Sequence, residues 1–216
     1  MKNLFLLAAF ITVTLTAGAQ NLAVFGGINL SNYKYKLNGT KLDRNNVFGF
    51  HLGLMSDVKL GGSKDLSFGV QPSLIYTGKG AENTNVGISN LKSVNRLNYV
   101  QLTLPVSYFF GDIKGSKDDA VIYGGVGPYV AYAISGKQKL EDLDGNITKT
   151  KFDMGNNAGD DFRSTDMGLS ITGGAKIIGL VFHVQYDLGL KNINPEAYNG
   201  TIKNRNLMLS IGYTIK

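Results

Sequence analysis

Two histidines and a group of charged or amide side chains are the residues of this sequence best suited to chemistry. His51 and His183 are the only histidines, and metal binding or general-base catalysis would need further partners converging on them. Carboxylates, lysines and glutamines of similar spacing can instead satisfy one another through ion pairs and hydrogen bonds. We therefore predict a buried polar network, with a narrow pore or proton path as the rival interpretation, formed by Gln71, Gln101, Asp166, Lys176, His183, Gln185, Asp187 and Lys191.

The acidic segment 141–146 resembles a calcium-binding loop only superficially. It lacks the third ligand spacing and the distal glutamate of an EF-hand. Asp144-Gly145 is typical of a hairpin turn, which would join 137–140 to 147–152. No nucleophile elbow, zinc-protease, phosphate-loop or dinucleotide motif occurs in the required context. The sequence thus predicts no catalytic residue, no metal and no cofactor, and a protein that is not an enzyme.

The elements that would position these side chains alternate with a period of two. In the clearest of them, Val100, Leu102 and Leu104 share one face, whereas Gln101 and Thr103 share the other. A soluble barrel fills its interior with apolar side chains, so a large apolar face opposite a small polar one favours a membrane barrel with a polar lumen. Eight segments show the alternation: 22–31, 47–59, 66–77, 97–110, 120–135, 164–177, 180–191 and 207–216.

The connections between these segments alternate in length. The short ones are 60–65, 111–119 and 178–179, and the long ones are 32–46, 78–96, 136–163 and 192–204. Outer-membrane barrels have short periplasmic turns, long outer loops and an even number of strands. The predicted fold is an all-β, eight-stranded, antiparallel, up-and-down transmembrane β-barrel. Tyrosines near strand ends or on outward faces are candidates for its aromatic girdles: Tyr33, Tyr35, Tyr76, Tyr99, Tyr108, Tyr132, Tyr186 and Tyr213.

The N-terminal residues predict export. A positive start, an apolar stretch from Leu4 to Thr16 and the small residues Ala17-Gly18-Ala19 have the three parts of a signal peptide. We expect cleavage after Ala19, which gives a signal peptide at 1–19 and a barrel domain at 20–216 that resides in the outer membrane of a Gram-negative bacterium. The alternative is an N-terminal membrane anchor. The absence of cysteine excludes disulfides and a cysteine-linked lipid.

The net charge of +6 comes from scattered cations, which argues against nucleic-acid binding. Lysines in loops are better suited to anionic headgroups or saccharide phosphates at the cell surface. The partners we expect are the lipid bilayer, lipopolysaccharide, the outer-membrane assembly machinery and a protein bound by the outer loops.

Four motifs resemble one known family. Residues 98–106 read NYVQLTLPV, residues 124–129 read GGVGPY, and residues 186–193 read YDLGLKNI; the last hairpin contains KNR at 203–205 and LSIGY at 209–213. Together they resemble the PorT-family outer-membrane β-barrel domain common in Bacteroidetes, over essentially the whole mature chain. The resemblance implies the barrel fold, and the named member of that family is implicated in the export of proteins to the cell surface.

Two functional hypotheses follow. The first is a barrel with a filled lumen that presents outer loops for adhesion or within an envelope or secretion complex. The second is a small-ligand carrier or narrow channel, including a lipocalin-like periplasmic barrel. A lumen filled by polar side chains favours the first hypothesis, whereas a continuous cavity would favour the second.

Overall fold

A computed structural model gives the fold of most of the chain beyond the predicted signal peptide. The signal peptide predicted at 1–19 lies outside the described residues, which are 21–42, 44–86, 91–111, 120–142, 144–155, 157, 159–195 and 199–215. Within these ranges, no helix has the length and apolar character needed to cross a membrane.

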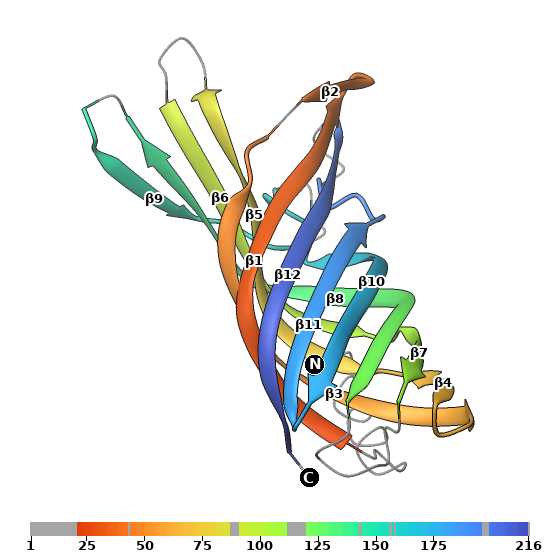
Figure 1. The fold of residues 1–216 in the computed structure, drawn as a ribbon. Coiled ribbons are helices and arrows are strands. Elements are labelled where there is room, and N and C mark those ends of the chain that lie inside the picture. The colour runs from red at the N-terminus through yellow and green to blue at the C-terminus, as the bar shows by residue number, and fades with distance from the viewer. Residues whose placement is uncertain are drawn as a thin grey trace.

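The strands pair into a closed antiparallel ring (Figure 1). β1 (Asn21–Leu37) closes it, because β1 pairs with β3 (Val47–Gly62) on one edge and with β12 (Thr201–Ile215) on the other. From β12 the order continues through β11 (Leu180–Gly189), β10 (Thr165–Ile177), β8 (Val121–Glu141), β6 (Leu91–Thr103) and β5 (Ser73–Val86), and returns to β3. The predicted eight-stranded antiparallel barrel is confirmed.

Two walls of the ring are interrupted at proline. β4 (Leu66–Val70) leads into β5, and β6 leads into β7 (Val106–Phe110), with Pro72 and Pro105 at the two breaks. Proline has no N–H to donate to a neighbouring strand. Their carbonyls still accept hydrogen bonds: that of Pro72 from the Ser56 backbone N–H and that of Pro105 from the Gln71 backbone N–H, each at 3.0 Å. The wall therefore continues through both breaks.

A third irregularity lies between β3 and β5. Their pairing ends at His51 and Thr77. Beyond this point β5 stays paired with β6 but leaves β3, and an isolated bridge between Asn45 and Glu82 is its next backbone contact on this edge. Side chains of β1 cross the gap, where the Asn29 amide donates to the Gly78 carbonyl and the Gly80 N–H donates to Ser31 Oγ at 2.8 Å. These bonds satisfy backbone groups that would otherwise be costly to leave unpaired.

Apolar side chains cover the outer surface of the ring, as the alternation predicts. Phe50, Phe48 and Ile122 are 75%, 64% and 62% exposed, values that suit contact with lipid tails rather than with water. We call this surface the apolar belt; it includes Ile28, Leu30, Phe48, Phe50, Leu52, Leu54, Tyr76, Val106, Tyr108, Phe110, Ile122, Val126, Val130, Tyr132, Ile134, Ile171, Phe182, Val184, Tyr186, Leu207, Leu209, Ile211 and Tyr213.

Two of the tyrosines considered for the girdles lie inside the barrel instead. Tyr33 is 7% exposed and Tyr99 is fully buried, and both belong to an interior cluster with Phe162 and Ile193. The outward-facing tyrosines are Tyr76, Tyr108, Tyr132, Tyr186 and Tyr213. The difference follows from parity, since a one-residue change of position along a strand moves a side chain to the other face.

The predicted loop 78–96 is wrong. β5 and β6 continue their pairing past the ring from Gly78 and Asn98, with β6 beginning at Leu91. The predicted hairpin in 137–152 is confirmed, because β8 pairs with β9 (Ile147–Lys151) through a turn at Gly145. Polar residues mask the alternation in these stretches, although strand pairing needs only backbone groups.

The continuing parts of β5, β6, β8 and β9 form one sheet. We call it the extension: residues 78–86, 91–98, 135–141 and 147–151. It rises from the barrel on the side away from β2 (Thr40–Leu42), a short strand paired with the end of β1 (Figure 1). The first residues of β1 pair with the last residues of β12 at the opposite end of the barrel.

Close packing of neighbouring strands generates a stability prediction at Gly27. A Cβ at this position would lie 2.0 Å from the Leu209 carbonyl oxygen, so Gly27→Ala must displace backbone and should lower the free energy of unfolding by about 1–3 kcal/mol. Urea unfolding in detergent micelles, followed by the gel mobility of unheated samples, measures the change.

Gly124→Ala is the matched control, because its nearest contact would be the Thr172 carbonyl oxygen at 3.8 Å. Equal unfolding midpoints for the two variants would contradict the packing argument.

Candidate functional site: the polar network of the lumen

Seven of the eight predicted network residues point into the lumen and are buried. They are Gln71, Gln101, Asp166, Lys176, His183, Gln185 and Asp187. The eighth, Lys191, follows the end of β11 and is only partly buried, and its ammonium donates to the Thr165 hydroxyl. The structure thus brings the strand residues together and leaves Lys191 apart from them.

An ion cluster centred on Lys79 joins opposite walls of the barrel. Lys79 Nζ on β5 lies 3.2 Å from Asp166 Oδ2 on β10 and 3.4 Å from Asp187 Oδ2 on β11, with all three side chains fully buried. Asp166 Oδ2 also accepts from Tyr129 Oη at 3.0 Å and from Asn204 Nδ2 at 2.9 Å. Buried charges are tolerated only when they are paired and hydrogen-bonded in this way.

Asp187 is held by three further donors. Gln101 Nε2 donates to its Oδ2 at 2.9 Å, while Ser170 Oγ and Gln185 Nε2 donate to its Oδ1 at 2.6 and 2.7 Å. These donors come from β6, β10 and β11. Each bond to an ionised carboxylate is stronger than one between neutral groups, so Asp187 fixes the relative positions of three walls.

A second ion pair crosses the lumen near the other end. Lys176 on β10 pairs with Asp57 on β3, and Gln71 Nε2 donates to Asp57 Oδ1 at 2.9 Å. Lys176 Nζ lies 5.8 Å from the centroid of the Tyr123 ring, within range of a cation–π contact. β3 and β10 lie opposite each other in the strand order, so this pair also couples distant walls.

The histidines take part in hydrogen bonds between these clusters. His51 Nε2 lies 2.7 Å from Ser210 Oγ, and His183 Nδ1 lies 2.9 Å from Tyr123 Oη. The Phe25 ring lies near both imidazoles, with its centroid 6.1 Å from that of His51 and 5.4 Å from that of His183. Among the described residues, no three His, Asp or Glu side chains are grouped so that they could hold a metal ion.

In the acidic segment 141–146, the Asp142 carboxylate stabilises a turn. Asp142 Oδ1 accepts from the backbone N–H groups of Asp144 and Asn146 at 3.0 and 2.8 Å, and Asp142 Oδ2 accepts from Asn146 Nδ2 at 3.0 Å. The bonds from Asn146 lower the pKa of the Asp142 carboxyl. Both carboxylate oxygens thus serve the β8–β9 hairpin.

Sequence reasoning missed two charged members of the network. Lys79 fell in the predicted loop 78–96, although Thr77, Lys79 and Ala81 continue the inward alternation of β5. Asp57 lies on the same face as His51, two positions beyond Met55. Continuing the period of two into polar residues would have found both.

A closed antiparallel ring with an apolar belt and a hydrogen-bonded polar interior defines an outer-membrane β-barrel. The profile of the family described as outer membrane protein beta-barrel domain matches residues 18–194, and the chain belongs to this family. Membership supports location in the outer membrane and contact with the lipid bilayer. A comparison with curated protein sequences finds no significant match.

Several solved structures are similar to the chain. Ail, the attachment invasion locus protein of Yersinia pestis, solved with the heparin analogue sucrose octasulfate, is 18% identical, with a TM-score of 0.40, covering 90% of this chain and 98% of Ail. The outer membrane protein OprG of Pseudomonas aeruginosa is 15% identical, with a TM-score of 0.42 and coverages of 90% and 95%. Neisserial surface protein A is 13% identical, with a TM-score of 0.36 and coverages of 90% and 96%.

The Lys79 cluster generates a second stability prediction. Lys79→Met leaves Asp166 and Asp187 buried without their cation, so the free energy of unfolding should fall by about 3–5 kcal/mol. Adding Asp166→Asn removes one of the uncompensated charges and should restore part of the loss. Equilibrium unfolding in detergent micelles measures both variants.

Lys149→Met on β9 is the matched control, because Lys149 is exposed and should change stability little. A loss for Lys79→Met no larger than for this control would refute the role of the ion cluster.

Proposed function

We propose that this chain is a non-enzymatic outer-membrane barrel with a sealed lumen, and that its function is an interaction made by the extension. The observation that carries the proposal is the fully buried contact of Lys79 with Asp166 and Asp187 across the lumen. An eight-stranded ring is just wide enough to be filled by side chains. Ions or ligands could pass only after these contacts broke.

The alternative, a narrow channel or small-ligand carrier, has less support. An apolar layer of Phe25, Met55, Ile75, Val181 and Met208 also occupies the lumen. Breaking a buried ion pair costs several kcal/mol, and an apolar layer offers no replacement for the water shell of an ion. Both features favour a closed interior.

The outer face of the extension supports an interaction role. Arg96, Lys137 and Lys151 lie in register across β6, β8 and β9, and Lys139 is paired with Lys149 one row further along. Like charges directly opposite each other are destabilising. A hollow of about 610 Å³ on this face is lined by Arg96, Lys137, Lys139 and Lys149 together with Glu82 and Lys92. This surface is suited to an anionic partner at the cell surface.

The orientation of the barrel follows the general rule for such proteins. Termini and short turns face the periplasm, and long hairpins face outward. Here the Gly179 carbonyl, in the short turn between β10 and β11, accepts a hydrogen bond from the Thr214 N–H near the end of β12, at 2.8 Å. The short turn and the end of β12 thus lie at the same end of the barrel, opposite the extension. The extension therefore faces the exterior in our proposal, where lipopolysaccharide surrounds it, while the periplasmic end meets the assembly machinery.

The narrower assignment to the PorT type stays a prediction from the four sequence motifs. A role in an envelope or secretion complex rests on that resemblance. It is compatible with a sealed barrel, because an interaction surface needs no pore.

The sealed lumen predicts the absence of a steady current. The refolded protein in a planar lipid bilayer should give no sustained conductance above background, because charged and apolar side chains block the path. A porin refolded in the same way serves as the positive control. A reproducible steady conductance would overturn the proposal in favour of the channel.

The proposed orientation is tested by labelling, since the chain has no native cysteine. Thr148→Cys in β9 should react with a membrane-impermeant maleimide on intact cells, because Thr148 is exposed on the extension. Ser63→Cys, exposed in the turn between β3 and β4, should react only after the outer membrane is opened. The reverse pattern would refute the orientation.

A further inference from the structure

The outer face of β1 and β12 changes abruptly from apolar to basic. Along the paired strands, Leu30 lies opposite Leu207 at the end of an apolar ladder, and two residues further on Asn32 lies opposite Arg205. The next outward pair is Lys34 and Lys203. The cations thus begin where the apolar belt ends, at the extension end of the barrel.

These cations have no described counter-ion. In the described part of the chain, no carboxylate pairs with Lys34, Lys36 or Lys203. Lys34 lies beyond the apolar belt and is fully exposed, and the positive charges of Arg205, Lys41 and Lys36 lower its pKa. Like charges held in register repel one another, so an anion bound among them would relieve this repulsion.

The guanidinium of Arg205 is held in place by backbone. Its Nη1 donates to the Gly189 carbonyl at 2.8 Å and to the Asn204 carbonyl at 2.7 Å. These bonds restrict the side chain before any ligand arrives, which reduces the entropy lost on binding. Arginine so positioned is well suited to bind phosphate oxygens.

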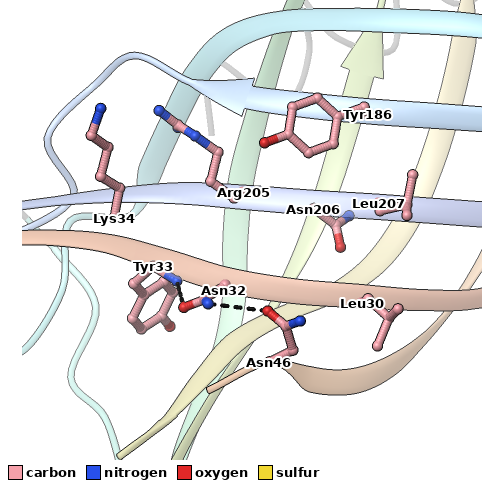
Figure 2. A pocket seen from close by; sticks show the side chains of 9 residues that line it. All are labelled: Leu30, Asn32, Tyr33, Lys34, Asn46, Tyr186, Arg205, Asn206 and Leu207. Atoms are coloured by element: carbon pink, nitrogen blue, oxygen red, sulfur yellow. Dashed lines mark hydrogen bonds between the residues drawn. The ribbon is translucent and has the colours of Figure 1, made fainter. Parts of the chain in front are cut away.

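A cleft joins the basic cluster to the apolar belt. It has a volume of about 440 Å³, and Lys34 and Arg205 lie at one end of it while Leu30 and Leu207 lie at the other, with Tyr186 beside them (Figure 2). A neighbouring hollow of about 330 Å³ shares Lys34 and Arg205 and adds Lys36 and Lys203. The surface is therefore amphipathic along the membrane normal.

We propose that this face binds a phosphorylated glycolipid of the outer leaflet. Its phosphate groups lie among Lys34, Lys203 and Arg205, and its acyl chains lie along Leu30 and Leu207. The backbone positions that carry these cations are about 5 Å apart on adjacent strands and about 7 Å apart two residues along one strand. Three cations grouped in this way suit a headgroup with more than one phosphate. The site rests on the outward orientation proposed above.

The test measures lipid binding to the full chain in detergent micelles by native mass spectrometry. Bisphosphorylated lipid A is the probe, and its fully dephosphorylated form is the comparison. The double variant Lys34→Gln/Lys203→Gln should weaken binding of the bisphosphorylated lipid about tenfold or more, because charge-assisted bonds to phosphate are lost. The dephosphorylated lipid should bind both proteins equally weakly.

Lys59→Gln/Lys64→Gln is the charge-matched control, since it removes two cations from the β3–β4 hairpin at the opposite end of the barrel, away from both basic surfaces. Binding unchanged in this control supports the site, whereas equal losses in both double variants overturn it as unspecific attraction. Competition by inorganic phosphate at millimolar concentration would also overturn it, because a lipid held by its acyl chains should resist displacement. Native gel mobility of unheated samples confirms that each variant is folded.

The cysteine labelling distinguishes a failure of the glycolipid site from a failure of the proposed orientation. If Thr148→Cys is labelled on intact cells and Lys34→Gln/Lys203→Gln binds lipid A normally, the glycolipid site is wrong and the orientation stands. If Thr148→Cys is protected, the orientation fails and the site fails with it, because the basic cluster would then face the periplasm.

Discussion

Backbone hydrogen bonding inside hydrocarbon is the constraint on which the rest of this structure depends. No water is available there to pair with a free N–H or carbonyl, so the strands must form a closed ring, and β1 meets both β3 and β12. Backbone groups are also paired where the strand pairing is irregular. Proline carbonyls continue the wall at Pro72 and Pro105, and Asn29 and Ser31 complete the gap beside β5.

Closure also determines what the interior can contain. Eight strands leave a lumen of side-chain width, where a charge meets little water and needs a partner within reach. Lys79 finds Asp166 and Asp187, and Lys176 finds Asp57, in each case on an opposite wall. Because separating such pairs is costly, these contacts hold opposite walls of the barrel together.

The charges outside the barrel are distributed over two different surfaces. The basic rows of the extension, which include Arg96, Lys137 and Lys151, lie on a sheet beyond the membrane-spanning ring. The cluster around Lys34 and Lys203 lies directly above Leu30 and Leu207. Charge alone would attract any polyanion to both surfaces, whereas the adjoining apolar surface selects for an amphipathic ligand at the second.

The sequence by itself determined the membrane-spanning strands and the faces of their apolar alternation, because side chains alternate across a strand whatever its neighbours are. Gln101 between Val100 and Leu102 had to face the lumen if the leucine and valine met lipid, and the same logic placed His183 and Asp187. The sequence could not determine that Lys79 would reach Asp187. Contacts across a barrel depend on strand order and stagger, which bring together residues far apart in the chain. Nor could it place Lys191, whose parity was suitable but which lies past the end of β11. Only the closed ring decided which polar side chains meet, and where the belt gives way to cations.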